Sequence, residues 1–257
     1  MRVQDMGGVE DIWLFILIGL AAQLVDGALG MAYGITCTSL LLALGAPPAL
    51  ASASVHTAEV GTSALSGSSH WALGNVDRRL FCKLLLPGVA GAALGALLVG
   101  WIDGALIKPL VAAYLLIVGV IVLWRTLRPR VSRPRQPGQL APPPQGLIAG
   151  FLDAVGGGGW GSINVTTLIA RGVEPRIAIG TVNAAEFFVS ATVAALLWQV
   201  VGPQSLLVVG GLLIGGLIAA PLAALAARRI PARIASGLTG GVVLLLSVST
   251  LAQSLIG

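Results

Sequence analysis

Charged side chains are scarce in this sequence. Only 10% of the 257 residues are Asp, Glu, Lys or Arg, whereas 56% are hydrophobic, and the mean hydropathy is +0.93. A soluble domain of this length needs a charged surface that this chain cannot supply. Apolar runs of roughly 20 residues, enough to cross about 30 Å of hydrocarbon, recur along most of its length. The composition therefore predicts an all-α polytopic membrane protein.

Cysteine and histidine are also rare, with two of each. Cys37 and Cys82 belong to different apolar segments without metal-binding spacing, so we expect two buried thiols and no disulfide. His56 and His70 lie on one segment, and neither GxSxG nor HExxH nor the phosphate-binding GxxxxGK[ST] occurs. These absences argue against an enzyme, a nucleotide-driven pump, a resident metal and a cofactor. We expect none of them.

The pI near 10 has a topological explanation. The arginines collect in short stretches between apolar segments, as cytoplasmic loops of membrane proteins do, so no nucleic-acid partner is expected. The richest stretch, RTLRPRVSRPRQPGQLAPPP from Arg125, is a proline-containing linker that cannot remain helical.

The sequence repeats itself with an offset of 127 residues. GLAAQLVDGALGMAYG from Gly19 aligns without a gap on GLIAGFLDAVGGGGWG from Gly146. The rare residues that coincide are Asp26 with Asp153, Pro48 with Pro175 and Glu59 with Glu186. We divide the chain into a first repeat over 1–127, a cytoplasmic Arg/Pro linker over 128–143 and a second repeat over 144–257.

Each repeat resolves into about five apolar segments. The expected ranges are 9–27, 29–44, 48–73, 80–101 and 105–124, then 146–155, 159–170, 175–200, 203–227 and 231–256. With five segments in each copy, and every basic cluster assigned to the cytoplasm, the copies enter the membrane from opposite sides. The fold class is thus an inverted repeat.

The glycine clusters interrupt the helices. The segments beside DAVGGGGWGS have about ten to fourteen residues and reach only about 15 to 21 Å, half a bilayer. We expect broken or re-entrant half-helices that meet near the midplane, because glycine permits the turn and unpaired backbone cannot face lipid. A half-helix N-terminus there would direct free N–H groups at an anion.

The substrate-binding candidates follow from these breaks. They are Asp26, Gly30, Tyr33, Gly34, Thr36, Asp153, Gly157, Gly158, Trp160, Gly161, Ser162 and Asn164. The alternative is that these residues only cap helices or pack in a tight bundle, since small residues also serve helix contact in membranes. For Asp26 and Asp153 in particular, a hydrogen bond to free amides competes with ion or proton coupling.

A second set of candidates could couple transport to a proton or an ion. Glu59 and Glu186 lie in the middle of their segments, and His56 and Asn183 precede them by three residues on the same face. A histidine and a glutamate within reach could pass a proton near neutral pH. Alternatively they form an inert hydrogen-bonded pair between helices.

The motifs resemble a known family. DGALGMAYG, LGAPPALASASVHTAEVGTSALSG and GNVD in the first half, with DAVGGGGWG and RGVEPRIAIGTVNAAE in the second, are similar to the sulfite exporter TauE/SafE family. The resemblance implies a multi-pass permease of the bacterial inner membrane that moves sulfite, sulfonates or related organic anions. It supplies no agreed set of functional residues.

The expected function is therefore a secondary transporter, outward in direction, for a small anion, with a proton on a buried carboxylate or on His56 as the candidate for coupling. The alternatives are a divalent metal cation permease that uses carboxylate ligands and, less favoured, an intramembrane enzyme. The expected partners are the small anion and the lipid bilayer. Glycine-rich faces at 88–100 and 210–221 allow close helix contact within one protomer or in a homodimer.

Overall fold

The computed structural model describes residues 11–29, 32–128, 143–202, 206–226 and 232–256. In these ranges all regular secondary structure is helical. The helices are α1 (Ile12–Leu29), α2 (Tyr33–Ala43), α3 (Pro48–Ala72), α4 (Arg78–Trp101), α5 (Gly104–Leu127), α6 (Pro143–Gly156), α7 (Trp160–Ala170), α8 (Pro175–Val201), α9 (Leu206–Ala226) and α10 (Ala232–Ile256). The five expected segments of each repeat are therefore present, and most of the Arg/Pro linker lies outside the described residues.

Helix lengths confirm an all-α polytopic membrane protein. Four helices of the described chain are long and apolar enough to cross a membrane: Arg78–Trp101, Gly104–Leu127, Pro175–Val201 and Gly237–Ser254. By contrast, α6 has 14 residues and α7 has 11, so they extend about 21 and 16 Å. Neither can cross the hydrocarbon alone, as the glycine clusters predict.

Equivalent helices of the two repeats run antiparallel. Along the contact of α3 with α8, Glu59 meets Ser190, whereas Gly67, two turns further along α3, meets Ala184. The numbering rises on one helix as it falls on the other. The pair α5 and α10 behaves alike, because Gly119 lies against Leu244 and Gly240 against Leu123. Two copies whose matching helices point in opposite directions form an inverted repeat.

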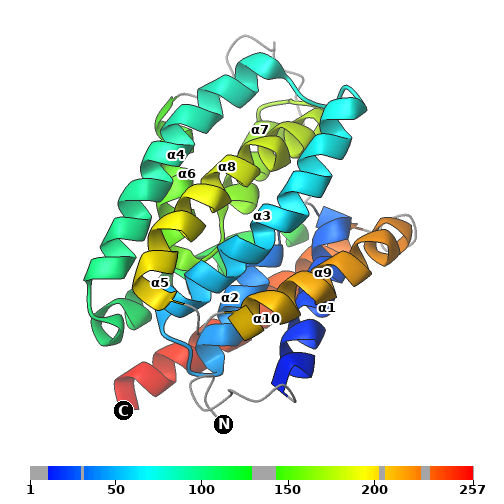
Figure 1. Ribbon diagram of the computed structural model, residues 1–257. Coiled ribbons are helices and arrows are strands. Elements are labelled where there is room, and N and C mark those ends of the chain that lie inside the picture. The colour runs from blue at the N-terminus through cyan, green and yellow to red at the C-terminus, as the bar shows by residue number, and fades with distance from the viewer. Residues whose placement is uncertain (1–10, 30–31, 129–142, 203–205, 227–231, 257) are drawn as a thin grey trace.

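The helices form two bundles, and each bundle contains one helix from the other repeat. One bundle contains α1, α2 and α3 of the first repeat with α9 of the second, and the other contains α6, α7 and α8 with α4 of the first. Figure 1 shows α4, α6, α7 and α8 together on one side of the molecule, with α1 and α9 on the other. The α3–α8 pair joins the bundles at their boundary, and α5 packs against α10.

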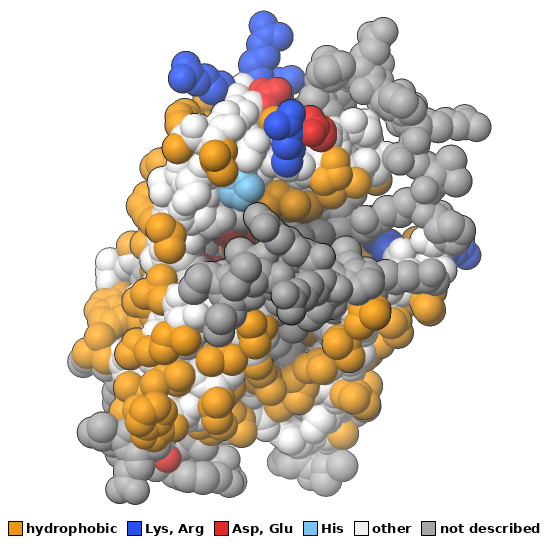
Figure 2. Space-filling view, turned by 90° about the vertical axis from the view of Figure 1, so that its right-hand side faces the viewer, with side chains coloured by type: hydrophobic (Ala, Val, Ile, Leu, Met, Phe, Trp, Pro, Cys, Tyr) orange, Lys and Arg blue, Asp and Glu red, His pale blue; other side chains and the backbone are white. Residues whose placement is uncertain are grey.

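Basic residues gather at one end of the molecule. The backbone N–H of Asp77, just before α4, donates to Thr181 Oγ1 near the start of α8 at 2.9 Å. This contact brings Arg78 and Arg79 to the same end as Arg171 and Arg176, which flank the start of α8. Figure 2 shows charged side chains at that end and mostly hydrophobic side chains below it. We call it the basic side; the sequence predicts that it is cytoplasmic.

The glycine-rich faces bring helices together within the protomer. A Cβ on Gly91 of α4 would lie 2.0 Å from the Leu147 carbonyl oxygen of α6, and one on Gly215 of α9 would lie 2.1 Å from that of Ile16 in α1. These contacts need glycine because backbones touch there. These glycines therefore serve helix packing within one protomer, whereas Gly210 faces open space, and a homodimer stays a prediction.

One expectation about cysteine is wrong. Cys37 is fully buried in α2, but the side chain of Cys82 is exposed in the first turns of α4. Position 82 follows Phe81 on the basic side, where the helix has only begun to enter the apolar region, so hydrophobic neighbours in the sequence did not indicate burial.

Candidate transport site

The second break is a turn of glycines between two half-helices. Gly157, Gly158 and Gly159 have φ values of 63°, 154° and 142°, which side chains with a Cβ rarely adopt. Asp153 stabilises this turn, because its Oδ1 accepts the Trp160 backbone N–H at 2.7 Å. A carboxylate at the end of α6 therefore satisfies a free amide at the start of α7.

Asp26 stabilises the first break in the same way. Asp26 Oδ1 accepts the backbone N–H groups of Ala32 at 2.6 Å and of Tyr33 at 3.1 Å, where α2 begins. Asp26 and Tyr33 are 127 residues before Asp153 and Trp160, so the repeat extends to individual hydrogen bonds. Gly30 lies outside the described residues. The carboxylates thus do bond to free amides, the simpler of the two roles considered for them.

The two breaks touch each other in the centre of the protein. A Cβ on Gly34 would lie 2.8 Å from Gly158 Cα and 2.7 Å from Glu59 Oε1. The Thr38 hydroxyl in α2 donates to the Gly157 carbonyl. Helical starts from opposite repeats therefore converge beside the carboxylate of α3, as the inverted repeat predicts.

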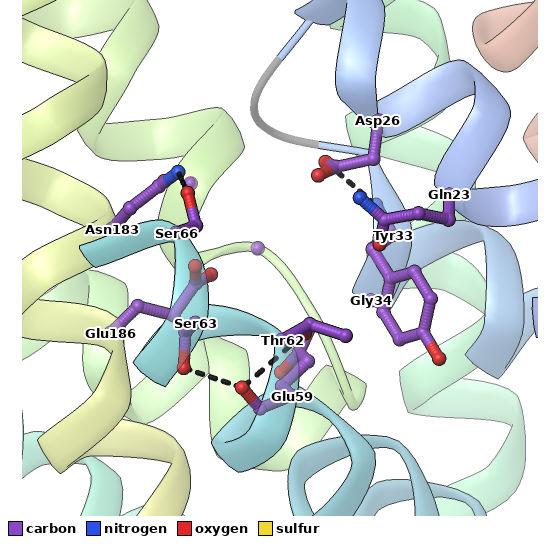
Figure 3. Close-up of a pocket in the computed structure, with 12 residues that line it drawn as sticks. Gln23, Asp26, Tyr33, Gly34, Glu59, Thr62, Ser63, Ser66, Asn183 and Glu186 are labelled. Atoms are coloured by element: carbon purple, nitrogen blue, oxygen red, sulfur yellow. Dashed lines mark hydrogen bonds between the residues drawn. The ribbon is translucent and has the colours of Figure 1, made fainter. Parts of the chain in front are cut away.

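A pocket opens at this junction (Figure 3). It is lined by Gln23, Asp26, Tyr33, Gly34, Glu59, Thr62, Ser63, Ser66, Gly159, Gly161, Asn183 and Glu186. Figure 3 shows Gln23, Asp26 and Tyr33 on one wall, with Asn183 and Glu186 opposite. Because α1 and α2 belong to one bundle and α8 to the other, the pocket lies between bundles.

The predicted residues divide into lining and supporting positions. Those that line the pocket are Asp26, Tyr33, Gly34, Gly161, Glu59, Asn183 and Glu186. Those not among its lining residues are Thr36, Asp153, Gly157, Gly158, Trp160, Ser162, Asn164 and His56. Trp160 is fully buried beneath Gly88 and donates its indole N–H to the Val182 carbonyl at 3.0 Å, so it is a packing residue and Tyr33 alone of the aligned aromatics faces the pocket.

The sequence analysis missed one polar face of α3. Thr62, Ser63 and Ser66 follow Glu59 at spacings of three, four and seven residues, which place them on the side of the helix that faces the pocket. This spacing could have been read from the sequence. Gln23, one turn before Asp26, could have been predicted in the same way, whereas the position of Gly159 depends on the fold of the glycine turn.

The pocket is acidic. Its lining contains the carboxylates of Asp26, Glu59 and Glu186 and no lysine, arginine or histidine. Glu59 is 5% exposed and accepts a hydrogen bond from Ser190 Oγ at 3.3 Å. The positive ends of α2 and α7 are partly engaged by Asp26 and Asp153. An anion entering this pocket would therefore meet carboxylates as well as helix termini.

His56 pairs with Asp153 and not with Glu59. Its Nε2 lies 2.9 Å from Asp153 Oδ2, and both side chains are almost completely buried. Its Nδ1 lies 2.8 Å from the Ser52 carbonyl oxygen, which can only accept, so Nδ1 carries a hydrogen. One further proton must then lie between Nε2 and Oδ2, on either atom. The shared face with Glu59 suggested the wrong partner.

The architecture indicates the class of protein to which the chain belongs. An inverted repeat of membrane helices, with interrupted helices around a pocket between two bundles, is the construction of a membrane transporter. The sequence model described as "Sulfite exporter TauE/SafE" matches residues 15–250, and the chain belongs to that family.

A relative of the chain supports the same class. The chain is 44% identical over 253 residues to the "Probable membrane transporter protein YtnM" of Bacillus subtilis (strain 168). The match covers 95% of this chain and 83% of that protein. No solved structure matches the chain. Family and relative together indicate a multi-pass membrane transporter.

Proposed function

We propose that the protein exports sulfite, a sulfonate or a related small organic anion across the membrane, together with protons held by the pocket carboxylates. The observation that supports this proposal most is the meeting of Gly34 with Gly158 beside Glu59. Helix N-termini from both repeats reach this point, and they provide backbone N–H groups that suit an anion. The family supplies the substrate class.

The charges in the pocket support proton coupling. Two like charges about 4 Å apart repel each other by roughly 4 kcal/mol at an effective dielectric constant near 20. An anion would meet this repulsion from Asp26, Glu59 or Glu186 if they were ionised. Protons on some of these carboxylates remove the repulsion and convert them into hydrogen-bond donors. Anion and proton thus occupy the pocket together.

A proteoliposome assay tests the proposal. Purified protein should accelerate sulfite or sulfonate movement over that in empty vesicles, and an imposed proton gradient should change the rate. Glu59→Gln should reduce movement at least about tenfold while the protein stays folded, because the amide cannot release a proton. Glu174→Gln is the matched control, since this carboxylate pairs with Arg176 at the surface and is 56% exposed. Equal rates in protein-containing and empty vesicles would refute anion transport.

A divalent metal cation is the second candidate, and the acidic lining favours it. Asp26, Glu59 and Glu186 offer hard oxygen ligands without a competing positive side chain. However, the described residues contain no group of three or more His, Cys, Asp or Glu placed to hold a metal ion. Metal uptake into the same vesicles, with sulfite remaining outside, would replace the anion by the cation as substrate.

A further inference from the structure

The two sides of the pocket region differ although the repeats are related. Away from the basic side, His56 of α3 bonds to Asp153 of α6, and the Ser52 hydroxyl donates to the Ala154 carbonyl at 2.7 Å. Each contact joins one bundle to the other. His56 and Ser52 are fully buried and Asp153 is 2% exposed. The burial of these residues shows that the pocket is closed on this side.

The equivalent positions on the basic side are apart. The counterpart of His56 is Asn183 on α8, and that of Asp153 is Asp26 on α1. Figure 3 shows these two residues on opposite walls of the pocket, where Asn183 donates to Ser66 Oγ at 2.9 Å. Asp26 and Ser66 are half-buried. The described pocket residues are thus less buried toward the basic side than at the His56–Asp153 contact.

The inverted repeat relates this conformation to a second one. Exchanging the roles of the repeats moves the open pocket to the other side and brings Asn183 of one bundle to Asp26 of the other. In the same movement His56 leaves Asp153 and faces Val193, the counterpart of Ser66. Val193 is fully buried in the described conformation, so it becomes accessible only after the exchange.

We propose that His56 and Asp153 form the gate that closes the transport site on the side opposite to the basic side, and that Asn183 and Asp26 form the alternate gate. This inference rests on the proposed transport function. The first gate includes a proton between its side chains, and the second joins an amide to a carboxylate without one. When the shared proton lies on Nε2, the first gate joins an imidazolium to a carboxylate, a stronger bond than that of a neutral amide to a carboxylate. This difference favours the described conformation, and opening the gate separates the two groups that hold the proton.

Cysteine labelling from each side of the membrane tests the gates. In a Cys82→Ser background, Ser66→Cys should react with an impermeant thiol reagent from the basic side, and its counterpart Val193→Cys should be protected. His56→Asn replaces the histidine–aspartate bond of the first gate, so that both gates then join an amide to a carboxylate. We expect labelling of Val193→Cys from the opposite side to become about tenfold faster, and that of Ser66→Cys slower, as for a bias of about 1.4 kcal/mol.

Asn183→His supplies an independent variant. It should strengthen the alternate gate with Asp26 and shift both labelling rates in the directions expected for His56→Asn. The double variant His56→Asn with Asn183→His should shift both rates furthest. His70→Asn, which changes the other histidine of α3 on the basic side, is the matched control and should change neither rate.

The labelling outcomes distinguish the proposed gates from the proposed transport function. Unchanged labelling in a folded His56→Asn or Asn183→His protein would overturn the proposal. Faster labelling at both cysteines would also overturn it, because loosened packing opens both sides whereas gate exchange opens one and closes the other. The labelling needs no substrate, so gates that respond in a protein that moves no anion would refute the proposed function alone.

Discussion

Gly34 is the position at which the contact between the two breaks can be tested most directly. In Gly34→Ala the new methyl group would lie 2.8 Å from Gly158 Cα, 3.2 Å from the Gly157 carbonyl oxygen and 2.7 Å from Glu59 Oε1. The carboxylate can move, but the two glycine atoms are backbone and belong to a turn held by Asp153. Overpacking of this kind costs about 1–3 kcal/mol, which exceeds the gain of up to about 1 kcal/mol that alanine gives within a helix.

The measurement is thermal unfolding in detergent, together with transport in vesicles. At about 2–4 °C per kcal/mol for a chain of this size, Gly34→Ala should lower the melting temperature by several degrees. It should also slow transport, because the shift occurs at the junction of the half-helices. Gly210→Ala is the control, since a Cβ there meets nothing within 4 Å. If Gly34→Ala melts and transports as the parent protein does, the breaks do not touch and the site described above is wrong.

Three further outcomes follow from single contacts. Trp160→Phe removes the donor to the buried Val182 carbonyl and should lower the free energy of unfolding by about 1–3 kcal/mol. The control Trp13→Phe changes a side chain that is 67% exposed and should leave the melting temperature unchanged. Equal melting temperatures for the two variants would contradict the packing role of Trp160. Gly158→Ala should prevent stable folding, seen by gel filtration, because its φ is 154° and its Cβ would lie 2.4 Å from the Gly34 carbonyl carbon. An impermeant maleimide should label the exposed Cys82 only in inside-out vesicles and should not label the buried Cys37, and labelling in right-side-out vesicles would reverse the orientation.

The fold could be predicted from the sequence because its helix breaks are marked by a run of glycines and by carboxylates, which are scarce in this chain. Four consecutive glycines beside Asp153 cannot continue a membrane helix, and the 127-residue offset finds the matching break at Asp26. Segment lengths then predict which helices cross and which return. The same information fixes the antiparallel relation of α3 to α8, since an odd number of segments reverses the second copy.

The contacts of the site could be predicted only in part. The helical face from Glu59 to Ser66 is a property of one segment, so its spacing was sufficient to reveal it. The partner of His56 depends instead on how α3 crosses α6, 97 positions away in the chain. Local spacing favoured Glu59 because residues three apart share a face, but the end of α6 passes closer to the ring. Pairing between bundles is set by tertiary packing, which the spacing along one helix does not contain.

The differences between the repeats carry more functional information than their likeness. Both copies keep an aspartate that caps the following half-helix and a glutamate near the centre, so these groups can serve either side of the membrane in turn. The polar pocket face repeats only in part, because Ser63 corresponds to Ser190 whereas Thr62 and Ser66 correspond to the buried residues Val189 and Val193. A site opened on the far side would therefore present valines where the basic side presents hydroxyl groups. A polar anion loses hydrogen-bonding partners in that exchange, as the outward direction proposed above requires for loading on the basic side and release on the other.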